Sequence, residues 1–456
     1  MSKDLNKGII SQKSETFDSS YKVDLYAPCT VGNGILRLDA TKKNRALSSF
    51  STYKKTPVFF IPASGSGSRM FKFLFEWLLD PTENKDEVDA FISALDSFPF
   101  YSQLFKIEGL DIANRRDVIS AILSEEILNL PGKPKGLIPF HVEDETVYNA
   151  FQEHVRQACT LLGGATVIHF TIQKEFEAEI KASIQNLGMR DVECKFSYQQ
   201  QETDAFCFAA NGELIEDNGV PLRRPAGHGA LLGNLNSIDN DIILIKNIDN
   251  VQHQHKSELS IETWKMCVGL LLDFKADLGE LGEHYSNEAL LDLNERYQFL
   301  SEKELASFDT NKLMQIASRP TRVCGMVKNE GEPGGGPFWI KDKGTVSKQI
   351  IEKVQIPDNS TAQMIVKQSS HFNPVFMVVS KSDVNGDTLD LDAYKDSSKY
   401  FVVNKSHKGA DVHYRELPGL WNGSMSNWNT IFVEIPLEVF SPVKTLNDLN
   451  KSPHQP

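Results

Sequence analysis

The sequence predicts an α/β protein with a mixed, mostly parallel sheet flanked by helices and a smaller β-rich C-terminal unit. Two observations carry this prediction. Almost wholly apolar runs such as Val58–Ile61 and Asp241–Lys246 alternate with helical stretches, as expected of strands buried on both faces of a parallel sheet. Toward the C-terminus the helical periodicity fades and short β-type runs follow one another. We therefore divide the chain into an N-terminal extension at 1–55, an α/β domain at 56–315 and a β-rich domain at 316–456.

The expected elements follow from local patterns. Residues 1–20 are polar and are expected to be loose. Apolar runs predict strands at Val58–Ile61, Thr166–Thr171, Glu193–Tyr198 and Asp241–Lys246. Apolar residues at helical spacing predict helices at Met70–Leu79, within 87–130 and at Phe176–Leu187. In the C-terminal domain, short β-type runs predict strands at Ala362–Val366, Val375–Ser380 and Thr430–Glu434.

The composition narrows the classes of partner. The chain has 456 residues and a formal net charge of -13, which disfavours non-specific binding to nucleic acid or to an anionic membrane. No apolar run reaches about 18 residues, and Met1–Lys13 has no apolar stretch, so we expect neither a membrane span nor a secretory signal. The six cysteines are scattered singly. This spacing argues against a thiolate zinc site or a disulfide framework and favours a cytoplasmic location.

The segment Pro62–Met70, rich in glycine and serine, joins the first expected strand to the first expected helix. Its glycines allow a tight turn that brings backbone N–H groups close to an anion, and its arginine suits phosphate oxygens. The spacing matches neither a P-loop nor the dinucleotide fingerprint, which needs a third glycine where the methionine stands. An ordinary turn uses the same residue types. The candidate phosphate-binding residues are Ser64, Gly65, Ser66, Gly67, Ser68 and Arg69.

Three further segments carry residues suited to a nucleotide or a sugar phosphate. Lys135 lies in a Pro-Lys dipeptide, although a lone loop lysine is more often simply solvated. The stretch Gly227-His228-Gly229 places small residues where a flat ring could approach the backbone, and Gln199 lies upstream after an expected strand. Lys246 and Asp249 follow the apolar strand at 241–246, and ligands of open α/β sheets gather at the carboxyl ends of strands.

Taken in order, these segments resemble the motifs of sugar-nucleotide pyrophosphorylases. Gly65-Ser-Gly-Ser-Arg-Met70 looks like their glycine loop, and the Pro-Lys dipeptide at Lys135 is similar to one found further along that family. Pro225-Ala-Gly-His-Gly229 resembles the loop that encloses the nucleotide base and sugar, and Lys246-Asn-Ile-Asp-Asn250 resembles a segment whose Asp helps hold a divalent metal. Over most of its length the chain is similar to an uncharacterised bacterial family with a GT-A nucleotidyltransferase core.

The resemblance implies a GT-A-like (Rossmann-like) fold and transfer of a nucleotidyl group from an NTP to a sugar 1-phosphate. It implies Mg²⁺ or another divalent metal, held by Asp249. We expect Arg69, Lys135 and Lys246 to make the catalytic contacts to phosphate, although the family segment has serine at the position of Lys246. Nucleotide binding falls to the glycine loop together with Gln199, Gly227, His228 and Gly229. The expected partners are therefore a nucleotide and a sugar phosphate.

Two alternative functions stay open. A GT-A glycosyltransferase would bind an NDP-sugar and release NDP, and a non-catalytic protein would bind nucleotide or sugar phosphate without turnover. The first alternative commonly uses a DxD metal motif, but Asp239-Asn-Asp241 precedes its strand and is expected to be a turn. His253 and His255 have no clear third ligand and are expected at the surface. The base, the sugar and the oligomeric state do not follow from the sequence.

The β-rich domain holds a polar group of its own. If the fold brings them together, a second ligand contact would be formed by Lys328, Glu330, Glu332, His371 and Asn373. Surface charges around a glycine-rich turn are the simpler interpretation of these residues.

Overall fold

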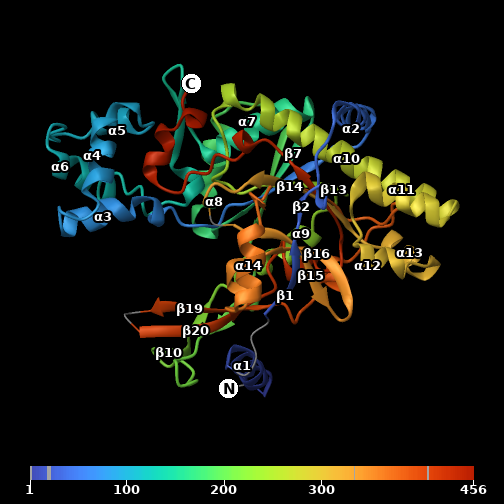
Figure 1. Cartoon of the computed structure of the whole chain (residues 1–456). Coiled ribbons are helices and arrows are strands. Elements are labelled where there is room, and N and C mark those ends of the chain that lie inside the picture. The colour runs from blue at the N-terminus through green and yellow to red at the C-terminus, as the bar shows by residue number, and fades with distance from the viewer. Residues whose placement is uncertain (1–2, 18–21, 333, 408–409) are drawn as a thin grey trace. The chain divides into compact units, whose positions relative to one another are not determined.

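The computed structural model describes residues 3–17, 22–332, 334–407 and 410–456. The chain forms two compact units that interleave along the sequence. Unit 1 comprises Met1–Tyr53, Gln199–Ile243 and Met266–Ile435, and unit 2 comprises Lys54–Tyr198, Leu244–Lys265 and Pro436–Pro456. The prediction of a mixed α/β protein with sheet strands flanked by helices is confirmed (Figure 1). The division at residues 55 and 315 stays a prediction.

Unit 2 is built on parallel strands in the order β4 (Val58–Pro62), β7 (Thr166–Ile172) and β8 (Val192–Tyr198). Phe60 lies opposite His169, and His169 lies opposite Lys195. The first strand is buried along its apolar length, as its run of four apolar residues predicts. The end of β13 (Ile242–Ile245) lies beside β4. All four strands expected for the α/β core are therefore confirmed.

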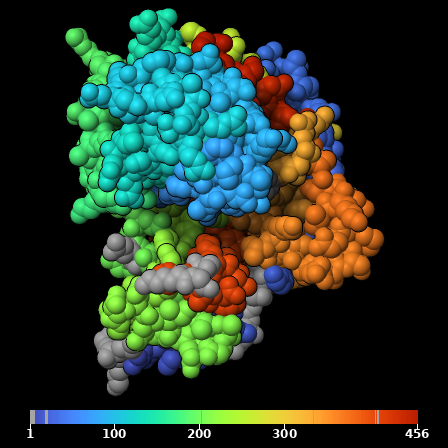
Figure 2. Space-filling model, turned by 90° about the vertical axis from the view of Figure 1, so that its left-hand side faces the viewer, coloured from blue at the N-terminus to red at the C-terminus, as the bar shows by residue number. Residues whose placement is uncertain are grey.

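The helices of unit 2 fall into two groups. An inserted group comprises α3 (Lys72–Leu79), α4 (Lys85–Ser93), α5 (Tyr101–Leu104) and α6 (Arg115–Leu123). It gathers around the buried ring of Phe91, whose centroid lies 6.1 Å from that of Phe73 and 4.9 Å from that of Phe98. This group forms the continuous blue-to-cyan surface in Figure 2. The second group, helices α7 (Ala150–Leu162) and α8 (Glu177–Gln185), follows the strand pair β5 (Pro139–Glu143) and β6 (Thr146–Asn149).

Unit 1 contains strands in the order β2 (Thr30–Val31), β3 (Gly34–Leu36), β21 (Asn429–Glu434), β14 (Thr321–Lys328) and β18 (Met377–Ser380). The pairs β14–β21 and β21–β3 are parallel, whereas β14–β18 is antiparallel. A second, antiparallel sheet has the order β1 (Asp24–Pro28), β15 (Gly336–Asp342) and β16 (Thr345–Ile351). Strands β19 (Phe401–His407) and β20 (Ala410–Glu416) pair antiparallel.

The chain also contains several two-residue strands and further helices. Two-residue strands are β9 (Ala205–Phe206), β10 (Glu216–Asp217), β11 (Val220–Pro221), β12 (Arg223–Arg224) and β17 (His371–Phe372). Other α-helices are α2 (Ala40–Thr52), α9 (Leu232–Asn236), α10 (Glu258–Glu283), α11 (Asn287–Tyr297), α12 (Glu302–Ala306) and α13 (Thr310–Ala317). None of the helices described combines the length and apolar character needed to cross a bilayer.

Two predictions of local structure are wrong. Within the N-terminal segment expected to be loose, Lys3–Phe17 forms helix α1, held by contacts far along the chain. Gln12 accepts a hydrogen bond from the backbone N–H of Phe206 at 2.8 Å, and the ring of Phe17 lies 6.1 Å from that of Phe208. The run Ala362–Val366, expected as a strand, lies in helix α14 (Ser360–Gln368), whose first turn is capped by the side chain of Asn359. The strands expected near Val375–Ser380 and Thr430–Glu434 are confirmed as β18 and β21.

Candidate functional site

The glycine loop leaves β4 and lies against the segment that contains Lys135. The backbone N–H of Lys135 donates to the carbonyl of Gly65 at 3.1 Å, and that of Gly67 donates to the carbonyl of Lys133 at 3.1 Å. A Cβ on Gly67 would stand 2.4 Å from Ile138, so packing alone requires glycine there. Gly65, in contrast, faces open space, with no atom within 4 Å of an added Cβ. The loop is thus packed against the protein at Gly67 and open to solvent at Gly65, and we call the side at Gly65 its open face.

The open face carries hydroxyl groups and a cation. The Ser66 hydroxyl donates to the Ser68 hydroxyl at 3.1 Å and accepts from the backbone N–H of Ser68 at 3.2 Å. Ser68 and Arg69 are exposed, and Ser64 is half-buried at the end of the strand. An exposed guanidinium beside hydroxyl and backbone donors is suited to an oxyanion such as phosphate.

Lys135 and Asp249 form an ion pair beside the loop. Lys135 Nζ lies 2.6 Å from Asp249 Oδ2, with side chains only 16% and 21% exposed. Gly136 is pressed against the segment that carries this aspartate, because an added Cβ would stand 2.9 Å from Ile248. The structure therefore brings together three of the predicted groups of unit 2: the glycine loop, the Pro-Lys dipeptide and the segment after β13.

A C-terminal segment that the sequence did not indicate holds the Asp249 loop. The carbonyl of Asp249 accepts from the backbone N–H of Val443 at 3.0 Å, and Asn250 Oδ1 accepts from the backbone N–H of Ser441 at 2.9 Å. Nothing in the local pattern of residues 436–456 predicts this role, because the contact joins positions almost 200 residues apart.

Lys246 directly follows β13 and is buried. Its exposed fraction is 1%, and burial lowers the pKa of its ammonium group to about 7. Burial also lowers the pKa of His154 to about 3, with the Lys246 charge adding to the effect. Across the described part of the chain, Lys246 forms no ion pair with a carboxylate. A buried amine without a counter-ion is a ready partner for an anionic ligand.

In unit 1, the loop at Gly227–Gly229 is fixed against residues 416–421. An added Cβ would stand 2.4 Å from Glu416 Oε2 at Gly227 and 2.2 Å from the Pro418 carbonyl at Gly229. Gly227 also has a φ of 74°, which glycine adopts without strain. Both glycines are therefore required by the loop itself.

His228 is held on both ring nitrogens. Nδ1 accepts from the backbone N–H of Leu420 at 2.8 Å, so Nε2 carries the proton and donates to Glu352 Oε1 at 3.1 Å. The imidazole stacks on Trp421 with 4.1 Å between ring centroids. With both nitrogens engaged, His228 is suited to positioning its loop or stacking on a ligand rather than to proton transfer.

Gln199 also belongs to unit 1, and its side-chain Nε2 is buried without a hydrogen-bond partner among the residues described. An amide donor in this state suits the acceptor edge of a base or a sugar hydroxyl. The nearby arginines are engaged within the protein: Arg223 donates to the carbonyls of Glu202 and Asp204, and Arg224 lies 2.6 Å from His407 Nδ1.

The expectation that His253 lies at the surface is wrong, because its side chain is fully buried. His253 Nδ1 accepts from the backbone N–H of His255, and its Nε2 donates to the Val142 carbonyl at 3.2 Å. His255 is exposed and pairs with Glu143 at 2.6 Å. Both histidines are thus engaged in local contacts.

Two other predicted groups have structural partners. Asp241 accepts from the Ser380 hydroxyl at 2.7 Å and from the Ser382 backbone N–H at 2.9 Å, as an aspartate that shapes a turn would. In the β-rich part, Lys328 and His371 lie opposite each other in the β14–β17 pair, and buried Asn373 donates to the Gly325 carbonyl at 2.8 Å. Glu332 accepts from the backbone N–H of Glu330 at 3.1 Å. Neighbouring backbone therefore accounts for much of this polar group.

The described residues contain no group of three or more His, Cys, Asp or Glu side chains able to hold a metal ion. Asp249 offers a single carboxylate, one oxygen of which faces Lys135. Mg²⁺ is commonly held by one or two carboxylates together with substrate phosphates, so this residue fits such an ion only when phosphate is bound beside it.

The fold and these contacts define a mixed α/β protein with a glycine loop, an adjoining lysine–aspartate pair and a buried lysine. The chain belongs to the family described as a domain of unknown function, DUF4301, whose sequence model matches residues 1–455. No curated protein matches the chain.

Solved structures of low sequence identity resemble the chain. One is the uridine diphosphate N-acetylglucosamine pyrophosphorylase from Trypanosoma brucei, at 12% identity and a TM-score of 0.49, covering 93% of this chain and 72% of that one. Another is a UDP-glucose phosphorylase from the same organism, at 13% identity and a TM-score of 0.46, covering 98% and 73%.

Proposed function

We propose that the protein transfers a nucleotidyl group from an NTP to a sugar 1-phosphate. The observation that carries the proposal is the meeting of the open glycine loop with Lys135 and Asp249, beside β4 and the end of β13. Loop amides, hydroxyl groups and cations within one small region suit a polyphosphate, and a carboxylate among them suits a phosphate-bound cation. The buried, unpaired Lys246 supports the same assignment.

The reaction would proceed by displacement at phosphorus. An oxygen of the sugar 1-phosphate attacks the α-phosphorus of the NTP, forming a new P–O bond as the bond to the β-phosphate breaks and pyrophosphate leaves. The loop and Arg69 hold the leaving phosphates, while Lys135 and Lys246 neutralise charge on the reacting oxygens. Such a site works by positioning and electrostatic stabilisation, without a covalent protein intermediate.

Asp249 is the residue that would hold Mg²⁺. When bound, this ion supplies charge neutralisation on the phosphate oxygens. Lys135 has a distinct part: it holds Asp249 in place before substrate arrives and turns to phosphate when the carboxylate changes partner. Gln199, Gly227, His228 and Gly229 are proposed to bind the nucleotide, with His228 fixing its loop.

The test is an assay for pyrophosphate release with each NTP and a panel of sugar 1-phosphates in Mg²⁺, paired with the reverse reaction from NDP-sugars and pyrophosphate. Formation of NTP in the reverse direction supports the proposal. NDP release to an acceptor, without pyrophosphate chemistry, would assign a glycosyltransferase instead. The engagement of Asp241 by Ser380 and Ser382 weighs against that alternative, because it occupies the one DxD sequence considered.

A second candidate is a nucleotide or sugar-phosphate binding protein without turnover. The ion pair between Lys135 and Asp249 favours it, because this pair neutralises the carboxylate proposed to hold the metal. Calorimetry distinguishes the two. Nucleotide binding that is independent of Mg²⁺, together with no product from any substrate pair, would support the binding protein.

A further inference from the structure

The outer edge of β8 is open. This strand ends the order β4–β7–β8, and no other described strand pairs with its second edge. The backbone N–H of Thr166 donates to the Asp191 carbonyl at 2.9 Å, which fixes the direction of the alternating backbone groups that follow. The groups that point away from β7 are the N–H and C=O of Val192, Cys194 and Phe196. A row of backbone groups that no strand pairs with is a template for another strand.

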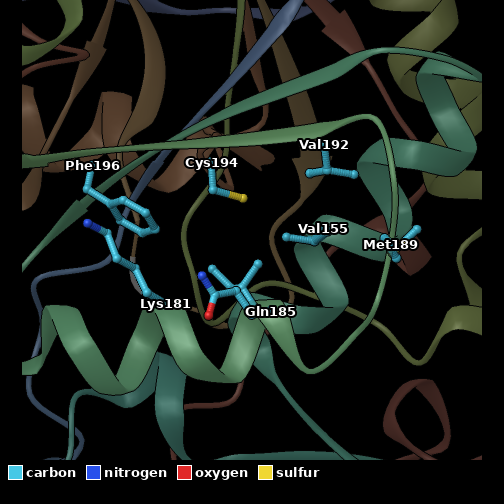
Figure 3. Close-up of a pocket in the computed structure, with 8 residues that line it drawn as sticks. Val155, Lys181, Gln185, Met189, Val192, Cys194 and Phe196 are labelled. Atoms are coloured by element: carbon cyan, nitrogen blue, oxygen red, sulfur yellow. The ribbon is translucent and has the colours of Figure 1, made fainter.

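A cavity of about 250 Å³, lined by both apolar and polar side chains, flanks this edge. Figure 3 shows the side chains of Val192, Cys194 and Phe196 directed into it from β8, with α8 opposite. Other lining residues come from helices and a loop, namely Val155, Lys181, Ile184, Gln185 and Met189. Among these lining residues, Met189 is 42% exposed. Apolar area next to unpaired backbone favours an added strand over solvent.

The other face of β8 carries opposite charges. Glu193 and Lys195 lie on that face, 3.8 Å apart, with side chains 63% and 47% exposed. In an antiparallel pair, residues directly opposite share one face. A second β8 centred on Cys194 would therefore place each Glu193 opposite a Lys195 and each Val192 opposite a Phe196.

We propose that β8 pairs antiparallel with β8 of a second copy of this chain, about a twofold axis through Cys194. The register is specified by charge. Two neighbouring registers would also keep the outward backbone groups paired. One sets Glu193 opposite Glu193 of the second copy, and the other sets Lys195 opposite Lys195. Like charges directly opposite are unfavourable, so both registers are disfavoured. The two cavities then lie on the same face of a continuous sheet, under paired apolar side chains. The surface is self-complementary, as a twofold interface requires.

The proposal is tested by sedimentation velocity over a concentration series. The unmodified chain is expected to show a monomer–dimer equilibrium. Lys195→Glu and Glu193→Lys each replace two attractive cross-strand pairs by repulsive ones, and each is expected to raise the dissociation constant at least about tenfold. The double variant Glu193→Lys with Lys195→Glu restores opposite charges and is expected to restore the dimer.

Lys106→Glu is the matched control for Lys195→Glu, because this lysine is exposed in the turn after α5 and its reversal changes the net charge by the same amount. It should leave the dissociation constant unchanged. Three results would overturn the proposal: a chain that stays monomeric throughout the series, a dimer that neither single reversal weakens, or a double variant no tighter than the single ones. Circular dichroism of each variant confirms folding, and the two single reversals serve as independent probes.

Discussion

Lys135 Nζ lies 2.6 Å from Asp249 Oδ2, so the lysine proposed for phosphate and the carboxylate proposed for metal neutralise each other before any ligand binds. Both side chains are largely buried, which keeps solvent from screening the pair fully. A polyphosphate with its bound cation would offer each of them a new partner of the right charge. When the ligand binds, the ion pair between Lys135 and Asp249 would be replaced by two: Lys135 with phosphate, and Asp249 with the cation.

Asp249→Asn is expected to lower turnover by about 10²–10³-fold, because it removes the negative charge proposed to hold the cation while keeping the size of the side chain. Because both side chains are largely buried, loss of this charged hydrogen bond is expected to lower the free energy of unfolding by about 1–3 kcal/mol, without unfolding the chain. Pyrophosphate release and urea denaturation measure the two effects. Asp89→Asn, which breaks an exposed ion pair to Arg115, is the matched control and should leave turnover intact.

Lys246→Met is expected to stabilise the free protein and to abolish phosphate binding. The unfolded chain holds this proton to a pKa of 10.5, whereas burial lowers the folded value to about 7. Between these values the unfolded state binds more protons, so the stability of the unmodified protein rises with pH through this window. Below pH 7 the cost of the buried charge is complete, at most about 5 kcal/mol, and the methionine removes it.

Lys348→Met provides the control for that variant. Lys348 is 3% exposed, and its pKa is lowered to about 8 by burial, yet its ammonium group donates to the Gly34 carbonyl within unit 1, whereas the glycine loop belongs to unit 2. Both variants should raise the thermal midpoint, and only Lys246→Met should lose ligand-induced stabilisation by nucleotide. Equal loss in both would contradict the assignment of Lys246.

The features recognisable in the sequence are those encoded by contiguous residues. The run Val58–Ile61 is apolar throughout because both faces of β4 are buried, and the glycine loop follows it directly. The hydrogen bonds that hold the Asp249 loop could not be predicted, because their donors are the backbone N–H groups of Ser441 and Val443, almost 200 residues further along the chain. Backbone donors carry no residue signature. The contacts of His228 could not be predicted either, because its partners Glu352 and Leu420 are distant in sequence.

The buried histidines of unit 2 predict loss of stability in acid. Burial lowers the pKa values of His141, His154 and His454 to about 3, and it raises that of Glu153 to about 7. Near pH 5.5 the unfolded chain binds almost three protons at these histidines, and the folded chain binds almost one at Glu153. The net difference of two protons lowers the free energy of unfolding by about 2.7 kcal/mol for each unit of falling pH.

His454→Gln isolates one part of this effect. His454 Nδ1 lies 3.0 Å from His141 Nε2, so glutamine keeps a polar partner there but does not titrate. Urea denaturation across pH 4.5 to 6.5 should give a slope smaller by about 1.4 kcal/mol per pH unit than that of the unmodified protein. An unchanged slope would mean that His454 is protonated in the folded state.

Replacing Gly229 by alanine should lower the stability of the protein, whereas the same change at Gly65 should leave it nearly unchanged. At Gly229 an added Cβ stands 2.2 Å from the backbone carbonyl of Pro418, so Gly229→Ala must displace main chain and is expected to cost about 1–3 kcal/mol of stability. At Gly65 an added Cβ meets nothing within 4 Å, and Gly65→Ala should change stability by less than about 0.5 kcal/mol. Its methyl group would instead stand on the open face of the loop, where the phosphates are proposed to bind.

Gly65→Ala is therefore expected to weaken nucleotide binding at least about tenfold, the equivalent of 1.4 kcal/mol, in calorimetry at constant Mg²⁺. Gly164→Ala is its control, because Gly164 also faces open space but follows α7, outside the loop. If Gly65→Ala and Gly164→Ala bind nucleotide equally well, the loop does not hold the phosphates. Weaker nucleotide binding by Gly65→Ala, with unchanged stability, would show that Gly65 serves ligand binding whereas Gly229 serves packing. Stability measurements on one variant alone could not make this distinction.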